Sequence, residues 1–524
     1  MKIRRAQWAA RLIPPVAAAA ALRLTLLAAA VLRTGRSVIA SGDTASYLAP
    51  GRNLLIHGRF ATGALPEINR TPGYPLFLAL ASLPGTAFAA LVQVVISALT
   101  VVLVARLARA VFDDERIALI AAWIFALEPV STIYSVRLLP ETLFLALLLL
   151  SLERLAVFLR DGRLRVLAVS GAWLGVATLV RPVSYYLGFA LALGLFAACI
   201  RIPGLRWKAP AVLLAGALPW LAAWQVRNRL ETGFGGFSTI VSRNLYFYEA
   251  AGVYARATRR PFVQVQSSFG YPDEASYLAH HPRQAGWSQS RRAAFMTAQA
   301  VSILRAYPGV ALGMQVEGAA VAALTPCAAD LLRMLGVWPR DWPSRVIARG
   351  PLRSALYLAH THPAIAALMA MLEATVLLFY LLAVRGAVRT GFRGAQLWLL
   401  CGVALYFLAV SGGAQAVGRY RLPIMPIICL LAAAGVARTE TGIESHPQNA
   451  EEPGLERESF VEGMKIWSYR GAKRRAGALR PGRYSGSEQT VRTGRRFERR
   501  CAATPSRRRT CRQRGWWIGR SFAR

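Results

Sequence analysis

Carboxylates and arginines stand beside long apolar segments of this chain, where ionisable side chains are costly. Asp43 follows the first apolar segment in Ser-Gly-Asp-Thr, and Glu141 opens a later one directly after Pro140. An aspartate at a lipid–water boundary can take a proton from an acceptor hydroxyl. It can equally accept amide hydrogen bonds as the N-cap of a helix. The residues leave both roles of Asp43 open, and the two are not exclusive.

Two further acids share this ambiguity. Glu141 is a candidate for acid–base chemistry, but Pro-Glu is also a favourable helix start because the helix dipole favours an acid there. Glu128 lies within the preceding apolar segment, in Phe-Ala-Leu-Glu-Pro-Val. An acid at that depth is a functional candidate unless it faces a partner, and Arg137 is a plausible structural partner.

Arginines expected on the outer side run against the positive-inside bias and form a third group, which consists of Arg70, Arg181, Arg227, Arg229, Arg243, Arg419 and Arg421. Arg419 and Arg421 flank Tyr420 before the last apolar segment, and Arg70 precedes a Pro-Gly-Tyr-Pro turn that contains Tyr74. A guanidinium fork binds phosphate oxygens in a bidentate manner, most strongly where water is scarce. We therefore expect the arginines to bind a phosphate, with the tyrosines in support. The alternative is snorkelling, in which interfacial Arg and Tyr anchor a helix end.

The elements that position these residues are membrane spans. The chain has 524 residues, of which 55% are hydrophobic, and apolar runs of about 18–25 residues recur through its first 437 positions. Such runs cross a bilayer as helices because each backbone polar group must be satisfied internally. We predict an all-α polytopic membrane protein with about 10–12 transmembrane helices. The expected spans are 12–32, 86–105, 117–134, 140–159, 166–180, 183–200, 210–226, 363–384, 394–411 and 420–437. The apolar region 309–325 is either a further span or a helix on the membrane surface.

The distribution of arginine predicts the orientation. Placing the N-terminus in the cytoplasm puts short Arg-rich connections inside, as the positive-inside rule requires. They are 106–116, 153–165, 201–208 and 385–393. The outside then receives the loops 33–85 and 227–362, the junction 134–140 and the tight loop 412–419. The basic N-terminus leads into apolar residues without a clear cleavage site, so we expect a retained first helix.

The net charge of +37 does not indicate a nucleic-acid partner. Residues 465–524 carry 19 Arg and Lys against two Glu, and much of the remaining excess lies in short loops. We predict a transmembrane domain over 1–437 and a polar, Arg-rich, disordered cytoplasmic tail over 438–524. Such a tail can contact anionic membrane lipids. The alternative is that it is a non-functional extension.

Five motifs in order resemble a known superfamily. They are the outer-loop Asp43, Asn-Leu-Leu-x-x-Gly over 53–58, Arg-x-Pro-x-Tyr-Pro-Leu-x-Leu over 70–78, Pro-Glu-Thr-Leu-Phe over 140–144 and Arg-Tyr-Arg-Leu-Pro-Ile-x-Pro over 419–426. Together they resemble the GT-C glycosyltransferases that use polyprenyl-phosphate sugars. Relatives in that superfamily include the protein O-mannosyltransferases and the lipid A aminoarabinose transferases.

The resemblance implies roles for individual residues. Asp43 matches the first-loop acid that acts as base or aligns the acceptor, and Glu141 matches the second acid. Arg419 and Arg421 match the approach to the last span. Arg70 lies beside the position where relatives keep a cation near the carrier phosphate, although Thr71 directly precedes the proline here. No Asp-x-Asp pair occurs in the outer loops near Asp43, so we expect no metal and no cofactor.

The resemblance therefore predicts a cell-envelope enzyme of glycan biosynthesis in the inner, cytoplasmic membrane. Its partners would be a polyprenyl-phosphate sugar and a lipid, glycan or protein acceptor on the outer, periplasmic side. Arginines would stabilise the phosphate that leaves. A transporter or lipid-linked-sugar flippase is the alternative, but such proteins use polar groups near the bilayer midplane and commonly show internal symmetry. Here the marked residues gather at one side.

Overall fold

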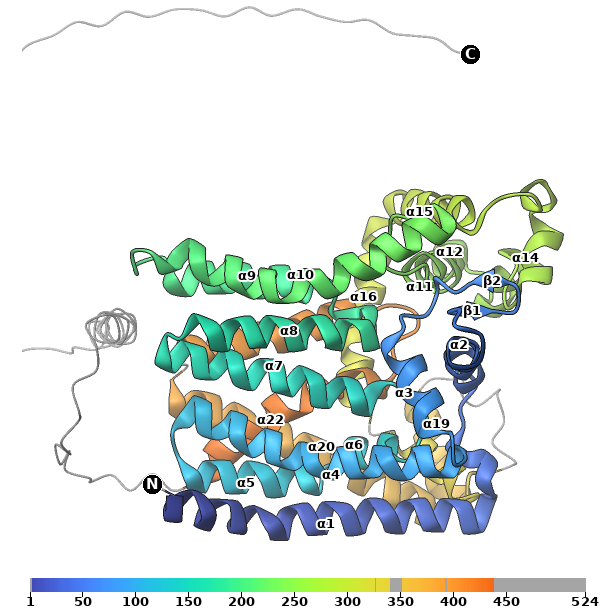
Figure 1. Cartoon of the computed structure of the whole chain (residues 1–524). Helices are drawn as coiled ribbons and strands as arrows, with labels where there is room; N and C mark the ends of the chain where they lie inside the picture. The colour runs from blue at the N-terminus through green and yellow to red at the C-terminus, as the bar shows by residue number, and fades with distance from the viewer. Residues whose placement is uncertain (1, 326, 340–350, 392–393, 438–524) are drawn as a thin grey trace, which may run out of the picture. The chain divides into compact units, whose positions relative to one another are not determined.

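The chain folds into a helical bundle with a smaller helical part at one end (Figure 1). A computed structural model describes residues 2–325, 327–339, 351–391 and 394–437. The tail prediction for 438–524 lies outside these described residues.

Among the described residues, six helical segments are long and apolar enough to cross a membrane. They are α1 (Lys2–Thr34), α4 (Thr86–Phe112), α7 (Glu141–Asp161), α9 (Leu187–Cys199) with the preceding 3-10 turn η2 (Pro182–Ser184), α10 (Leu205–Thr232) and α20 (Pro363–Thr390). Two bent pairs raise this number to at most eight in the described part of the chain. The all-α polytopic class is confirmed.

The described spans are fewer than the 10–12 predicted because three apolar helices are short. These are α8 (Leu164–Val180), α21 (Ala395–Val410) and α22 (Met425–Val436). They match the predicted spans 166–180, 394–411 and 420–437 closely in position. Each has fewer than the roughly 20 residues that usually cross a bilayer.

The predicted span 117–134 is two helices, α5 (Glu115–Ala126) and α6 (Pro129–Ser135), bent by 54°. The break falls at Glu128–Pro129, where proline lacks an amide hydrogen and suits the first helical position. The Glu128 carboxylate accepts hydrogen bonds from the amides of Val130 (2.9 Å) and Ser131 (2.5 Å). The second bent pair is α16 (Pro308–Leu324) and α17 (Ala328–Met334), at 55°, so the region 309–325 belongs to a candidate span.

Close packing holds the bundle helices together. α8 packs against α7 and α10, and α20 packs along α22. At the α8–α10 contact, a Cβ on Gly171 would lie 2.1 Å from the Leu213 carbonyl oxygen, and one on Gly216 would lie 2.3 Å from the Ala168 oxygen. Glycine therefore permits these two backbones to touch, as small residues commonly do between membrane helices.

Short elements gather at one end of the bundle (Figure 1). From the first half of the chain they are η1 (Arg36–Ile39), α2 (Thr44–His57), the antiparallel pair β1 (Ala61–Thr62) and β2 (Leu65–Pro66), and α3 (Gly73–Ala81). From the later part they are α11 (Ile240–Asn244), the π-helical turn η3 (Leu245–Ala250), α12 (Ala251–Thr258), α13 (Phe262–Ser268), α14 (Glu274–His280), η4 (Pro282–Gln284), α15 (Gln289–Ala306), α19 (Pro351–Thr361) and η5 (Gly418–Arg421).

This grouping follows the sequence-based orientation. The loops expected outside lie together, whereas the connections α4–α5, α7–α8 and α9–α10 lie at the opposite end (Figure 1). A site at the crowded end therefore draws residues from segments that are far apart in the sequence.

Candidate functional site

Asp43 lies at the N-cap position of α2, but its side chain makes no capping hydrogen bond. Its carboxylate instead contacts two guanidinium groups. Oδ1 lies 2.9 Å from Nη2 of Arg70, and Oδ2 lies 3.8 Å from Nη2 of Arg419. The side chain is 42% exposed, so a substrate hydroxyl can reach the carboxylate. The capping hydrogen bond is therefore not formed, and the chemical role of Asp43 stays a prediction.

Arg70 is held by the first turn of α2. Besides the contact to Asp43, it donates to Ser46 Oγ from Nε (3.2 Å) and Nη2 (2.9 Å) and to Tyr47 Oη from Nη1 (2.9 Å). Its guanidinium carbon also lies 4.2 Å from the centre of the Tyr47 ring. These contacts use all three guanidinium nitrogens, so Arg70 is placed to orient Asp43.

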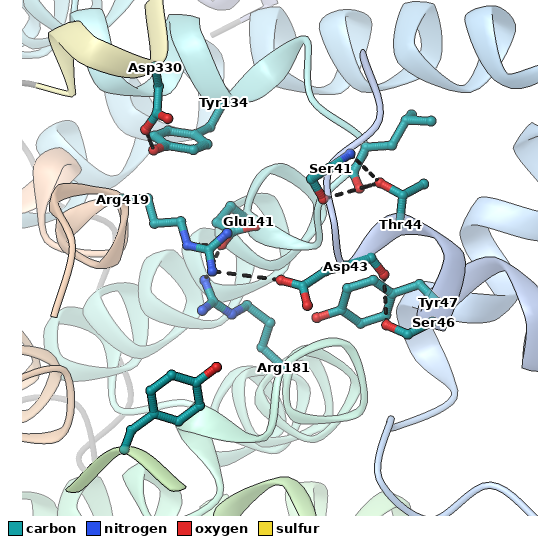
Figure 2. A network of polar contacts seen from close by, with 12 residues as sticks. Ser41, Asp43, Thr44, Ser46, Tyr47, Tyr134, Glu141, Arg181, Asp330 and Arg419 are labelled. Carbon is teal, nitrogen blue, oxygen red and sulfur yellow. Dashed lines mark hydrogen bonds and ion pairs between the residues drawn. The ribbon is translucent and has the colours of Figure 1, made fainter. Parts of the chain in front are cut away.

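Glu141 is the first residue of α7 and its side chain is only 2% exposed. Oε1 lies 3.3 Å from Nη1 of Arg181 and 3.8 Å from Nε of Arg419. Figure 2 shows the Arg419 side chain between Glu141 and Asp43. One arginine from the last part of the chain thus bridges the two acids that the motifs singled out.

The predicted supporting tyrosines differ in their surroundings. The ring of Tyr420 lies 5.3 Å from the Arg419 guanidinium carbon and 5.8 Å from that of Arg181. Tyr74 is fully buried, donates to Gln93 Oε1 (2.8 Å) and packs edge-on against Tyr47 at 5.0 Å. Burial raises the pKa of Tyr74 well above its usual value. Tyr420 therefore lies within the arginine cluster, whereas Tyr74 packs beneath Tyr47, which in turn contacts Arg70.

Arg421 points away from the acids. It is fully buried, and its Nη1 donates to the carbonyl oxygens of Ala323 and Thr325, both at 2.8 Å. These carbonyls belong to the C-terminal end of α16, where helix carbonyls lack intrahelical partners. The sequence pattern grouped Arg421 with Arg419, but the structure places them in different surroundings.

Glu128 also lies away from this cluster. It is fully buried, and Arg23 of α1 is a charged group that acts on it through space. Arg137, the expected partner, makes no ion pair with Glu128 among the described residues. The Glu128 carboxylate accepts the two α6 amides described above, so its contacts are those of a helix cap.

The structure adds residues that the motifs did not assign. Arg181 follows α8 in Leu-Val-Arg-Pro-Val. Its position between an apolar helix and a proline is the sequence feature that indicates an arginine at the end of a span. Tyr47 lies four residues after Asp43, which places both on one helix face. Tyr134 donates a short hydrogen bond to Asp330, and Figure 2 shows this pair beside Arg419. No local pattern in the sequence indicates that last contact.

Charge in the cluster favours an anion. Two carboxylates, of Asp43 and Glu141, face three guanidinium groups, of Arg70, Arg181 and Arg419. Although burial opposes its charged form, the nearby Glu141, Tyr420 and Asp43 raise the pKa of Arg419 above its usual value. Guanidinium groups therefore outnumber the two carboxylates that they contact in a partly desolvated place, and such an excess suits a phosphate.

A separate cavity of about 730 Å³ lies between the 234–242 loop and α15. Ser242 and Thr297 in its lining are joined by a hydrogen bond of 2.9 Å. The loop is tied to the strand region of the first outer loop, since Thr239 donates from its amide to the Ile68 carbonyl (3.0 Å). The lining is mostly apolar, with hydroxyl groups from Ser242, Ser290, Thr297 and Ser302 and one guanidinium, of Arg305.

Comparisons with known proteins bear on this arrangement. Residues 73–224 match the model of the family described as dolichyl-phosphate-mannose-protein mannosyltransferase. The resemblance expected from the motifs is confirmed. The matched segment contains Tyr74, Glu141 and Arg181, whereas Asp43 and Arg419 lie outside it and pack against it.

Solved structures of glycosyltransferases are also similar. One is the archaeal oligosaccharyltransferase AglB from Archaeoglobus fulgidus, in complex with an inhibitory peptide and a dolichol-phosphate. It gives a TM-score of 0.47 and 13% sequence identity, and the match covers 92% of this chain and 53% of the AglB chain. ArnT from Cupriavidus metallidurans bound to undecaprenyl phosphate gives a TM-score of 0.34 and 15% sequence identity. The match covers 79% of this chain and 76% of the ArnT chain. The chain spans about half the length of the archaeal protein. The search of curated proteins found no significant match to this chain.

Proposed function

We propose that this protein transfers a sugar from a polyprenyl-phosphate carrier to an acceptor on the outer, periplasmic side of the cytoplasmic membrane. The observation that carries the proposal is the bridge that Arg419 makes between Asp43 and Glu141. A matching family segment supplies Glu141 and Arg181 to the same cluster. Together they support a site that combines an accessible carboxylate with an excess of guanidinium charge.

The proposed reaction is a displacement at the anomeric carbon. The acceptor hydroxyl attacks this carbon, the new carbon–oxygen bond forms, and the bond from the carbon to the phosphate oxygen breaks. Asp43 takes the hydroxyl proton, and the polyprenyl phosphate leaves with the bonding electron pair. Negative charge grows on that phosphate, so Arg419 and Arg181 would stabilise the transition state more than the ground state.

The remaining residues would position these groups. Arg70 orients the Asp43 carboxylate, and the buried Glu141 fixes Arg181 and Arg419 through Oε1. Arg421 was expected to bind the donor phosphate as well; its bonds to Ala323 and Thr325 support a role in shaping the α16 end. The cavity beside α15 is the part of the outer loops that we propose for acceptor selection.

The decisive experiment uses the purified protein in lipid nanodiscs. Radiolabelled undecaprenyl-phosphate hexoses and pentoses are offered with extracted envelope lipids and glycans, and products are separated from the donor. Transfer of label with release of undecaprenyl phosphate supports the proposal. Movement of intact donor between leaflets of proteoliposomes without its consumption would instead establish a flippase. Lipid and glycan analysis of a deletion strain then identifies the acceptor.

A further inference from the structure

The segment 411–418, Ser-Gly-Gly-Ala-Gln-Ala-Val-Gly, carries the chain from α21 to Arg419. Residues 411–413 are buried, and no helix or strand is formed before η5 begins at Gly418. Because this segment lacks the regular backbone hydrogen bonds of a helix or strand, its conformation depends on its tertiary contacts. The position of the Arg419 guanidinium therefore depends on what holds this segment.

One side of the segment rests on α16. A Cβ on Gly318 would lie 2.2 Å from the Gly413 amide nitrogen, so the two backbones are in direct contact. Gln315 of the same helix donates to the carbonyl of Ala409. At the far end, a Cβ on Gly418 would lie 2.5 Å from the Thr325 carbonyl oxygen. This side of the segment therefore rests on the backbone of α16 and on Thr325, which follows it.

The other side of the segment contacts α12, where a Cβ on Gly252 would lie 2.7 Å from the Ala414 Cβ, and it receives a hydrogen-bonded carboxylate from η3. Glu249 lies in the π-helical turn η3, and its Oε2 accepts a hydrogen bond of 3.2 Å from the Ala414 amide. A Cβ on Gly413, whose φ is +88°, would lie only 2.1 Å from the same oxygen. Burial raises the pKa of Glu249, while the bond from Ala414 acts against this. Short π-helical turns occur frequently at functional sites.

The same turn also comes near the arginine cluster, because Asp43 and Tyr420 act through space on Tyr248. Tyr248, the residue before Glu249, shares a hydrogen bond of 3.0 Å with the hydroxyl of Tyr271. Burial first, then the Tyr271 contact and the nearby Asp43 and Tyr420, raise the pKa of Tyr248 above its usual value. The turn η3 therefore contacts the 411–418 segment through Glu249 and comes near Asp43 and Tyr420 through the adjacent Tyr248.

We propose that Glu249 is a positioning residue for Arg419. By fixing the Gly413–Ala414 backbone against α16, it keeps the Arg419 guanidinium between Asp43 and Glu141. The outer loops would then contribute to donor binding through a residue that touches neither substrate. The catalytic part of this inference rests on the proposed function, whereas the structural part can be tested without it.

The structural test is hydrogen exchange of the intact protein in nanodiscs, read by mass spectrometry on peptides that cover 411–418. Glu249→Ala should make these amides exchange faster. Glu249→Gln should protect them as the wild type does, because its amide oxygen can accept the Ala414 bond. Glu249→Asp keeps the charge but is shorter by one methylene, so it should behave like Glu249→Ala. Glu274→Ala, also in the outer loops and 56% exposed beside Arg292, is the matched control.

The functional test measures donor kinetics in the same variants. Loss of one hydrogen bond that fixes Arg419 should raise the KM for the lipid donor by about tenfold, with a smaller change in kcat. Glu249→Gln should restore the KM to within about twofold of the wild type. Gly413→Ala, which displaces the same carboxylate from the opposite side, should reproduce Glu249→Ala with the glutamate intact.

The possible results separate the two proposals. Unchanged exchange in Glu249→Ala overturns the contact, and faster exchange with an unchanged KM overturns the positioning role. If the wild type transfers no sugar from any donor, the proposed function fails. The exchange experiment, together with binding of undecaprenyl phosphate to wild type and Glu249→Ala, then still decides whether Glu249 places Arg419 to hold an anion.

Discussion

At the residue scale, the two acids in the site differ in exposure, and we propose separate roles for them on this basis. Asp43 is 42% exposed, whereas Glu141 is 2% exposed. A group that exchanges protons with a substrate must be reachable, and a group that fixes arginines is most effective where water is excluded. Asp43 is therefore the residue that we expect to act on the acceptor, and Glu141 the one that holds the arginines in place.

The Asp43→Asn variant tests this assignment. The amide keeps the size of the side chain but cannot take a proton, so transfer should fall by at least about a hundredfold. Membrane insertion and thermal stability should stay near the wild type, because the native side chain makes no capping bond. Asp273→Asn, where asparagine can still cap α14, is the control. Full transfer by Asp43→Asn would remove this residue from the mechanism.

Arg419 and Arg421 should respond differently to the same change. Arg419→Gln removes the bridge between the acids, so donor turnover should fall by about a hundredfold or more. Arg421→Gln removes the donor to the Ala323 and Thr325 carbonyls, which should cost about 1–3 kcal/mol of stability. The measurements are donor kinetics and thermal unfolding in detergent. A stable Arg421→Gln protein with weakened donor binding would instead restore the phosphate role expected from the sequence.

At the scale of elements, a buried arginine holds the broken helix pair α5–α6. Arg23 of α1 donates to Ser97 Oγ (2.8 Å), to the Ala126 carbonyl (2.9 Å) and to Ser131 Oγ (3.0 Å). Ala126 is the last residue of α5, so its carbonyl has lost the partner that a continuous helix would provide. The arginine therefore links three helices at the point where one of them is interrupted.

Replacing Arg23 should destabilise the bundle strongly. Arg23→Leu leaves the Ala126 carbonyl unsatisfied and Glu128 without its nearby positive charge, at a cost of about 3–5 kcal/mol. Arg23→Leu combined with Glu128→Gln should recover part of this loss, since the uncompensated charge is then gone. Thermal unfolding of the purified variants measures both changes. Arg11→Leu, on the same helix and exposed, should change little.

The turn η3 predicts a dependence of stability on pH. Burial raises the folded-state pKa of Glu249, so the folded state binds its proton more tightly than the unfolded state does. The stability that this proton contributes is present below the ordinary carboxyl range, near pH 4, and is lost as pH rises through the raised value. Glu249→Gln does not titrate, so its stability relative to the wild type should increase over that interval. A constant difference between pH 4 and pH 8 in thermal unfolding would contradict this.

These elements could be predicted from the sequence where the interactions that form them are local, and not where the interacting residues are far apart in the chain. Helix positions such as Glu141–Asp161 follow from apolar length and a Pro-Glu start, both of which are local. The placement of Asp43 and Glu141 at one site followed from the predicted topology and from the order of the motifs. The separation of Arg421 from Arg419 could not be predicted, because two residues in one 3-10 turn point to different helices. Arg23 and Glu128 likewise meet only after α1 packs against α6.

At the scale of the whole molecule, the proposed function requires one orientation in the membrane. The segments that hold Asp43, Glu141 and Arg419 reach the same end of the bundle as the short outer elements (Figure 1). The connections with many arginines lie at the other end, as the positive-inside rule expects for the cytoplasmic face. The donor phosphate and the acceptor would therefore meet on the outer side, where the polyprenyl tail remains in the bilayer.

Cysteine labelling in intact cells tests this orientation. In a background with Cys501→Ser and Cys511→Ser, Ala64→Cys in the β1–β2 turn and Ala285→Cys after η4 should react with a membrane-impermeant maleimide. Pro203→Cys, in the connection between α9 and α10, should react only after the membrane is permeabilised. All three positions are exposed, so labelling reports the side of the membrane rather than burial. The reverse pattern would place the arginine cluster in the cytoplasm, where an enzyme of this kind would not meet its proposed acceptor.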